Sequence, residues 1–300
     1  MMKIFVDTAL IDEIKQAESW GILDGVTTNP SLIKKAVDRM KGVSLEDYIS
    51  DILKTVKGPV SLEVAGSTYE DMVKEAKILH KKFNHINDNV VIKIPVNTCM
   101  ELGEDNFEGI RAIKTLSEEN IPVNCTLIMS SNQALMAAKA GAAYVSPFLG
   151  RIDDHLRHAM GLVGGKDHPK DIYYPEELAQ RIRDYKLIDL LDGKRPDEVI
   201  YKDNDVMKIY DWANDDGIYS GVDLIASIQQ IYANYEFKTE IIAASVRNAR
   251  QVRLCAEIGV DIATIPFNVI DDMMVHYKTS EGMKAFCKDV VPEYRAILED

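Results

Sequence analysis

Short runs of apolar and β-branched residues recur along the chain, separated by stretches with helical periodicity. This alternation is typical of βα units, in which a helix covers each buried parallel strand. We interpret as strands residues 3–7, 25–28, 60–64, 90–94, 122–125, 144–147, 240–243 and 262–265. Eight such strands within 300 residues predict an α/β fold, and they favour a closed (β/α)8 barrel over an open sheet.

The clearest helical pattern follows Ser44, which forms a capping-box-like start together with Asp47. Between the sixth and seventh strands, residues from about 155 to 220 break the alternation. This segment holds six of the thirteen tyrosines and no run typical of a buried strand. We interpret it as a partly helical loop insertion in a single barrel domain spanning residues 1–300. It could cover the mouth of an active site, form an oligomer contact or be a tolerated surface insertion.

Composition and charge narrow the possible partners. The formal net charge of −13 argues against nucleic acid or an anionic membrane surface as the main partner. The sequence has no apolar stretch as long as a membrane span and no signal-peptide pattern, and its four cysteines are scattered. His155 and His158 have metal-ligand spacing but no apparent third ligand, so we expect no metal. These features predict a cytoplasmic protein.

Polar side chains gather at the carboxyl ends of the expected strands, where barrels of this type place their active sites. Lys93 is the most informative because it lies within the apolar run VVIKIP. Burial lowers the pKa of a lysine, and the neutral amine can attack a carbonyl to form a Schiff base. The alternative is a structural ion pair with Glu63 or Asp7 inside the barrel. These carboxylates could transfer the protons that imine chemistry needs, although Asp7 could instead cap a helix.

Two arginines follow neighbouring strands and could together bind an anion. Arg151 follows the sixth strand, and Arg247 lies with Ser245 between the seventh strand and the next helix. Asn29 and Asn124 could donate amide hydrogen bonds to a polyol, or could be turn or cap residues. The residues alone leave these alternatives open.

Five segments closely resemble transaldolases and the related fructose 6-phosphate aldolases. They are FVDTA (5–9), DGVTTNPSL (24–32), VIKIP (91–95), VNCTLIMSSNQALMAAKAGAAYVSPFLGRIDD (123–154) and TEIIAASVRN (239–248). The resemblance covers about residues 1–97, 107–154 and 221–290 in the family's order. It implies a barrel that is circularly permuted relative to other Schiff-base aldolases, with the reactive lysine on the fourth strand.

The resemblance also assigns a role to each matching position. Lys93 would form the imine, Asp7 would act as acid and base at the bond that breaks, and Glu63 with Thr126 would hold the catalytic water. Asn29, Asn124 and Ser146 would bind the dihydroxyacetone hydroxyls. Arg151, Ser245 and Arg247 would bind the phosphate.

Phe148 separates the two activities within this family. The aldolases carry a tyrosine at this position and tend to carry glutamine at position 63, so Phe148 and Glu63 favour transaldolase. The resemblance therefore implies transfer of dihydroxyacetone from sedoheptulose 7-phosphate to glyceraldehyde 3-phosphate in the pentose phosphate pathway, without a cofactor. The alternatives are a fructose 6-phosphate aldolase and a non-catalytic sugar-phosphate-binding protein. We expect a homo-oligomer.

Overall fold

The computed structural model describes residues 1–38, 42–101, 104, 106–199, 202–211 and 217–298. Eight parallel strands pair in sequence order, and the last pairs with the first to close a barrel. They are β1 (Lys3–Asp7), β2 (Gly25–Thr27), β3 (Val60–Glu63), β4 (Val90–Pro95), β5 (Val123–Ile128), β6 (Tyr144–Pro147), β7 (Glu240–Ala243) and β8 (Ile262–Ile265). The expected (β/α)8 barrel is confirmed, and each expected strand lies within three residues of its observed ends.

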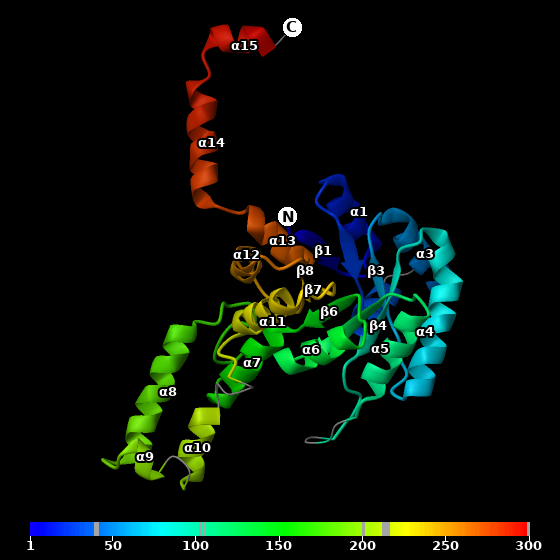
Figure 1. Ribbon diagram of the computed structural model, residues 1–300. Coiled ribbons are helices and arrows are strands. Elements are labelled where there is room, and N and C mark those ends of the chain that lie inside the picture. The colour runs from blue at the N-terminus through cyan, green and yellow to red at the C-terminus, as the bar shows by residue number, and fades with distance from the viewer. Residues whose placement is uncertain (39–41, 102–103, 105, 200–201, 212–216, 299–300) are drawn as a thin grey trace.

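Helices surround the barrel and bury its outer face (Figure 1). Those directly between strands are α1 (Ile11–Ser19), α2 (Pro30–Val37), α3 (Leu45–Thr55), α4 (Tyr69–Phe83), the short 3-10 helix η1 (Asn84–Ile86), α5 (Glu108–Glu118), α6 (Ser131–Lys139), α7 (Leu149–Ala159), α11 (Gly221–Tyr235) and α12 (Ala249–Ile258). The expected start of α3 is confirmed, because the Ser44 hydroxyl accepts a hydrogen bond from the Asp47 amide and donates one to its carboxylate. Apolar side chains of strands and helices form the main core, with Ile92 and Ile94 fully buried.

The strand register places the key polar residues side by side. Asp7 is paired with Thr27 between β1 and β2, Glu63 with Lys93 between β3 and β4, and Lys93 with Asn124 between β4 and β5. Paired residues of neighbouring strands project to the same face of a sheet. These side chains therefore line one region near the carboxyl end of the barrel.

The strand β5 contains an irregularity close to this region. Its pairing with β6 shifts between Cys125 and Ile128, and Leu127 has a left-handed φ of 58°. The strand also continues to Ile128, three residues beyond the expected end, so Thr126 lies within it. Bulges of this kind re-aim side chains and are common next to active sites.

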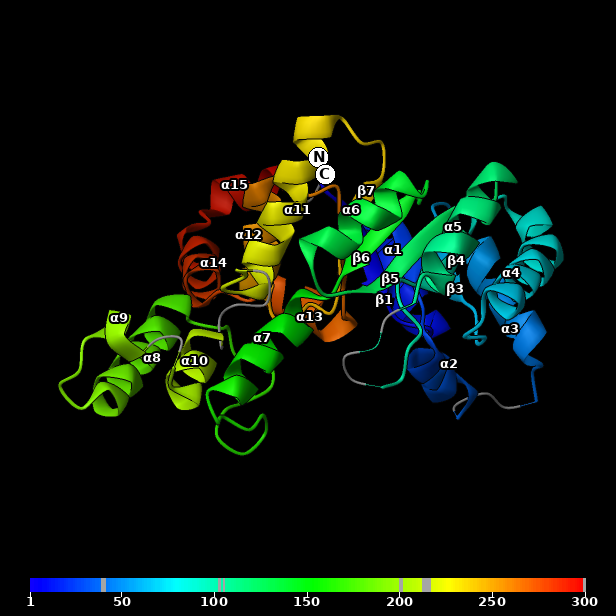
Figure 2. The same ribbon diagram turned by 60° about the horizontal axis from the view of Figure 1, so that its bottom comes forward.

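The chain between β6 and β7 is partly helical, as expected. After α7 it forms α8 (Glu176–Leu191), α9 (Pro196–Val199) and α10 (Asn204–Asp211) before α11 begins. Helices α8, α9 and α10 extend away from the barrel in both views (Figures 1 and 2). The segment joining α7 to α8 lies at the same edge of the molecule as α2, the lower edge in Figure 2.

The last strand is followed by α13 (Phe267–Met274), α14 (Tyr277–Asp289) and α15 (Pro292–Leu298). Helix α13 packs against the barrel, where the Phe267 ring stacks on Trp20 at 5.4 Å between centroids. The later two helices extend away from the barrel (Figure 1), and neither has a buried residue in the described part of the chain. None of the described helices has the length and apolar character needed to cross a membrane.

Candidate functional site

Lys93 lies on β4 with its side chain inside the barrel, and the residue is only 4% exposed. Its Nζ lies 3.6 Å from Glu63 Oε2 and donates a hydrogen bond of 3.3 Å to the backbone carbonyl of Thr28. The same Nζ lies 5.9 Å from the centroid of the Phe148 ring. The expected buried amine beside a carboxylate is therefore present, with an aromatic ring on another side.

Two carboxyls, from strands β1 and β3 on either side of β2, lie near Lys93. Loss of hydration raises the pKa of Asp7, and it does so against the nearby positive charge of Lys93 and a 2.8 Å hydrogen bond from Thr27. Loss of hydration also raises the pKa of Glu63, again against the charge of Lys93. A carboxyl whose pKa is raised toward neutral pH is suited to both giving and taking a proton.

A hydrogen-bonded row of polar side chains continues around the barrel from β3 to β6. The Ser146 hydroxyl donates to Asn124 Oδ1 at 2.7 Å, and Asn124 Nδ2 donates to the Ser61 hydroxyl at 3.2 Å. Thr126, on the irregular part of β5, is buried, but its hydroxyl has no hydrogen-bond partner among the described residues. An unpartnered buried hydroxyl is costly, so Thr126 is suited to binding a water or substrate oxygen.

Asn29 has a structural role at the edge of this region. Its side-chain oxygen accepts a hydrogen bond of 3.0 Å from the Leu32 amide and caps the amino end of α2. The cap role left open by the sequence is therefore present, and it uses only the side-chain oxygen. Among the described residues the amide nitrogen of Asn29 has no hydrogen-bond partner, so it could donate to a ligand.

Phe148 and Arg151 meet at the start of α7. The guanidinium carbon of Arg151 lies 5.0 Å from the Phe148 ring centroid, and Arg151 is one of the charges that oppose the raised pKa of Glu63. The Arg151 guanidinium and the Lys93 amine therefore both lie close to the Phe148 ring.

Arg247 lies on the loop after β7, close to α7, and is held by residues that the sequence did not single out. Its Nη2 forms an ion pair of 2.9 Å with Asp154 Oδ2, and its backbone amide donates to Gln251 Oε1 at 2.8 Å. Ser245, two residues earlier, has a left-handed φ of 62°. Gln251 lies only four residues after Arg247, whereas Asp154 is 93 residues away and no local pattern signals its pairing with Arg247.

Gly150 allows the close approach of α7 to this loop. A Cβ atom built on Gly150 would lie 2.0 Å from the Ser245 carbonyl oxygen and 3.0 Å from Arg247 Cγ. Only glycine fits so close a contact with backbone. The start of α7, which carries Arg151, therefore lies close to the loop that carries Arg247.

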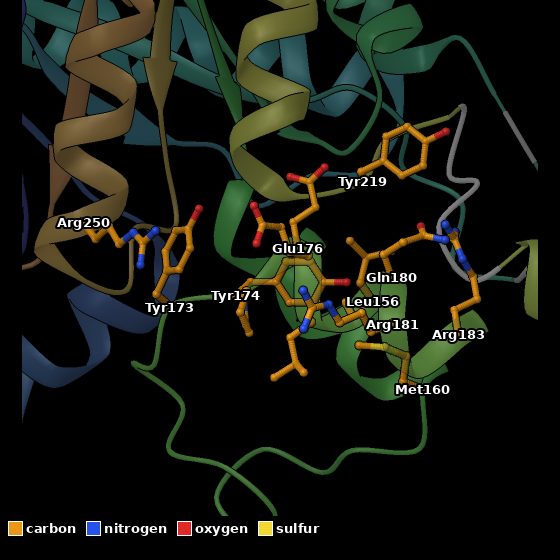
Figure 3. Close-up of a pocket in the computed structure, with 14 residues that line it drawn as sticks. Leu156, Met160, Tyr173, Tyr174, Glu176, Gln180, Arg181, Arg183, Tyr219 and Arg250 are labelled. Atoms are coloured by element: carbon orange, nitrogen blue, oxygen red, sulfur yellow. The ribbon is translucent and has the colours of Figure 1, made fainter. Parts of the chain in front are cut away.

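Two cavities lie near α7. One of about 610 Å³ is lined by Arg247 and Asp154 together with His168 and Lys170 of the α7–α8 segment. Another of about 870 Å³ is lined by the end of α7, residues 173–175 and the start of α8 (Figure 3). The second cavity contains none of the expected site residues, and its Arg250 stacks on Tyr173 at 4.0 Å from the ring centroid. Of the expected site residues, the first cavity contains Arg247.

Within the described part of the chain, no group of three or more His, Cys, Asp and Glu side chains is arranged to hold a metal ion. His155 and His158 lie on the surface of α7, where they contribute to no such group. The four cysteines are free thiols, and burial raises the pKa of Cys255 to about 12.

Comparison with known proteins gives a consistent result. The family model described as Transaldolase/Fructose-6-phosphate aldolase matches residues 4–191 and 195–297. A probable transaldolase of Thermoplasma acidophilum is 40% identical over 300 residues, which cover 99% of this chain and 100% of that protein. Probable transaldolases of Hydrogenobaculum sp. and Carboxydothermus hydrogenoformans are 40% and 38% identical over 288 residues, which cover 96% of this chain. The matches include most of the segment between β6 and β7.

Proposed function

The chain belongs to the transaldolase/fructose-6-phosphate aldolase family, and on this premise we propose that it is a transaldolase acting through a Schiff base on Lys93. The observation that carries the proposal is the buried Lys93 amine, 3.6 Å from Glu63 and close to Asp7, whose carboxyls both have raised pKa values. An amine in this setting has proton donors and acceptors for each step of imine chemistry.

The donor, sedoheptulose 7-phosphate, enters with its carbonyl carbon facing Lys93. The amine attacks this carbon, and the carbinolamine loses its hydroxyl as water after receiving a proton from Glu63 through a water molecule. Thr126 holds that water, which is supported by its buried and unpartnered hydroxyl. The product of this step is an iminium ion on Lys93.

Asp7 then takes the proton from the C4 hydroxyl of the bound sugar. The C3–C4 bond breaks, its electron pair neutralises the iminium as an enamine, and erythrose 4-phosphate leaves. The enamine carbon next attacks the aldehyde carbon of glyceraldehyde 3-phosphate, whose oxygen takes the proton back from Asp7. Hydrolysis of the imine releases fructose 6-phosphate. Every electron pair and proton is returned, so the reaction needs no redox cofactor.

The remaining site residues bind substrate in this proposal. Asn124, Ser146 and the free amide nitrogen of Asn29 bind the hydroxyls of the three-carbon unit. Arg151, Ser245 and Arg247 bind the phosphate. This is supported by contacts of both arginines with the first turns of α7, Arg151 with Phe148 and Arg247 with Asp154. Phe148 favours transfer over aldolase activity because its ring offers no hydroxyl near the enamine.

Two assays test the proposal. Borohydride with fructose 6-phosphate should inactivate the enzyme and leave a three-carbon adduct on Lys93, detected by peptide mass mapping. Fructose 6-phosphate should yield product only when erythrose 4-phosphate is added as acceptor. Free dihydroxyacetone without an acceptor would assign aldolase activity, and an adduct on another lysine would refute the mechanism.

We also propose that the chain forms a single domain and assembles as a homo-oligomer. The assembly is supported by apolar side chains exposed along the carboxyl-terminal helices: Tyr277, Met283, Phe286, Tyr294, Ile297 and Leu298. A row of this kind is typical of an interface. Sedimentation of the full chain and of Phe286→Ser tests it, because loss of an apolar contact should weaken assembly. A monomeric full chain would refute it.

A further inference from the structure

The α7–α8 segment brings a second cation to the cavity that contains Arg247. This cavity of about 610 Å³ is lined by Arg247 and Asp154 and by His168 and Lys170 of the α7–α8 segment. We propose that Lys170 binds the phosphate of the sugar substrate together with Arg247 and so sets the preference for phosphorylated acceptors. This inference rests on the proposed transaldolase activity and adds a residue from the segment between β6 and β7 to its site.

The residues that follow Lys170 are fastened to the barrel one after another. Asn248 Nδ2 donates to the Asp171 carbonyl at 2.9 Å, and buried Arg157 donates to the Ile172 carbonyl at 2.6 Å. Arg250 stacks on the Tyr173 ring, as Figure 3 shows. Asn248 and Arg250 both lie within three residues of Arg247. The position of Lys170 relative to Arg247 is therefore fixed by direct contacts between their two segments.

The residues that precede Lys170 form a compact turn. The Gly165 amide donates to the His168 carbonyl at 2.7 Å, and the Val163 amide donates to the Asp167 carboxylate at 2.8 Å. His168 is half-buried, and its Nδ1 lies 2.8 Å from the Pro169 carbonyl oxygen. A turn held in this way limits the loss of conformational entropy when a ligand binds.

The charges of the cavity leave room for an anion. Asp154 is occupied by its ion pair with Arg247, whose guanidinium keeps further N–H donors for a ligand. Lys170 is exposed and forms no ion pair among the described residues. The other charged group of the lining, Asp171, is exposed and anchored through its backbone. A phosphate dianion between Arg247 and Lys170 would add the contact that Lys170 lacks.

The test compares Lys170→Met with Lys166→Met, a matched variant of the same turn whose side chain is exposed and does not line the cavity. Lys170→Met should raise KM for glyceraldehyde 3-phosphate roughly three- to thirtyfold, because it removes one charge-assisted contact. KM for unphosphorylated glyceraldehyde and kcat with saturating acceptor should stay within about twofold. Lys166→Met should match the wild type, and Lys170→Arg should retain most of the preference.

Equal KM values for Lys170→Met and Lys166→Met, or equal losses for both acceptors, would overturn the inference. Calorimetry of inorganic phosphate binding to the unreacted enzyme tests the role of Lys170 independently of the proposed transaldolase activity. Weaker phosphate binding in Lys170→Met supports the subsite even if the wild type fails to transfer dihydroxyacetone. Unchanged phosphate binding in an active enzyme refutes the subsite and leaves the transaldolase assignment intact.

Discussion

Glu63 and Lys93 are paired in the register of β3 and β4, and Lys93 Nζ lies 3.6 Å from Glu63 Oε2. This distance is longer than a hydrogen bond. The carboxylate therefore attracts the amine electrostatically but does not fix its position through a hydrogen bond. The amine also contacts the Thr28 carbonyl and lies over the Phe148 ring. In the proposed mechanism, this pair keeps the nucleophile close to a proton-transfer group.

Replacing Lys93 by methionine tests this relationship. Lys93→Met should keep the fold by circular dichroism but lose at least about 10³-fold in kcat, because the nucleophile is removed. The charge of Lys93 partly offsets the burial that raises the pKa values of Asp7 and Glu63. Without this charge, both pKa values should rise further. Lys114→Met is a suitable control because that lysine is exposed and forms an ion pair with Glu118 on the surface. Transfer activity or a trapped adduct in Lys93→Met would contradict the mechanism.

The strands and the polar residues at their ends could be predicted from the sequence. Each buried strand appears as a short run of apolar residues, and the polar residues directly follow or interrupt these runs. The pairing of Arg247 with Asp154, and of Asn248 with the Asp171 carbonyl, could not be predicted. These contacts join segments 77 to 93 residues apart, and only closure of the barrel brings them together. For Asn29 the sequence offered a cap role and a ligand-binding role as alternatives. In the structure its side chain caps α2 and also lies beside the site.

The contact of α7 with the loop after β7 could likewise not be predicted from the sequence. Gly150→Ala should displace this loop, because the new Cβ would lie 2.0 Å from the Ser245 carbonyl oxygen. We expect a loss of about 1–3 kcal/mol in unfolding free energy and a higher KM for phosphorylated acceptors. Gly282→Ala in α14 is the control, because no heavy atom outside its own helix lies within 4 Å of its added Cβ. Equal stability of the two variants would show that the loop adapts freely.

Asp7 gives a prediction about pH. Loss of hydration raises its pKa in the folded protein above the ordinary value of 3.8. The folded state therefore holds the proton more tightly than the unfolded state, and this contribution to stability is lost as pH rises through the folded pKa. Asp7→Asn cannot ionise, so its unfolding free energy relative to wild type should increase between pH 4 and pH 7.

Urea unfolding at both pH values measures this difference, and kcat should fall by about 10²–10⁴ because the acid and base is lost. Asp51→Asn is the control, since Asp51 is exposed and its pair with Lys54 lies on the surface. A relative stability of Asp7→Asn that decreases with rising pH would show that Asp7 is stabilised as the carboxylate.

In the proposed mechanism, Phe148 determines the fate of the enamine on Lys93. Its backbone amide donates to the Ile128 carbonyl at 2.9 Å, and its ring centroid lies 5.9 Å from Lys93 Nζ and 5.0 Å from Arg151 Cζ. The ring is therefore close to the proposed nucleophile. Because a phenyl ring cannot relay a proton, we expect the enamine to persist until an aldehyde arrives.

Phe148→Tyr should add a hydroxyl near the reacting carbon at little steric cost. Positioned acid or base groups contribute about 10²–10⁴ in rate, enough for protonation of the enamine to compete with transfer. The variant should release dihydroxyacetone from fructose 6-phosphate without an acceptor, while its transfer activity falls. Phe148→Leu is the matched control, because it also changes the ring but adds no hydroxyl, and it should release none. Rapid release by the wild type would instead show that a phenyl ring at this position does not protect the enamine.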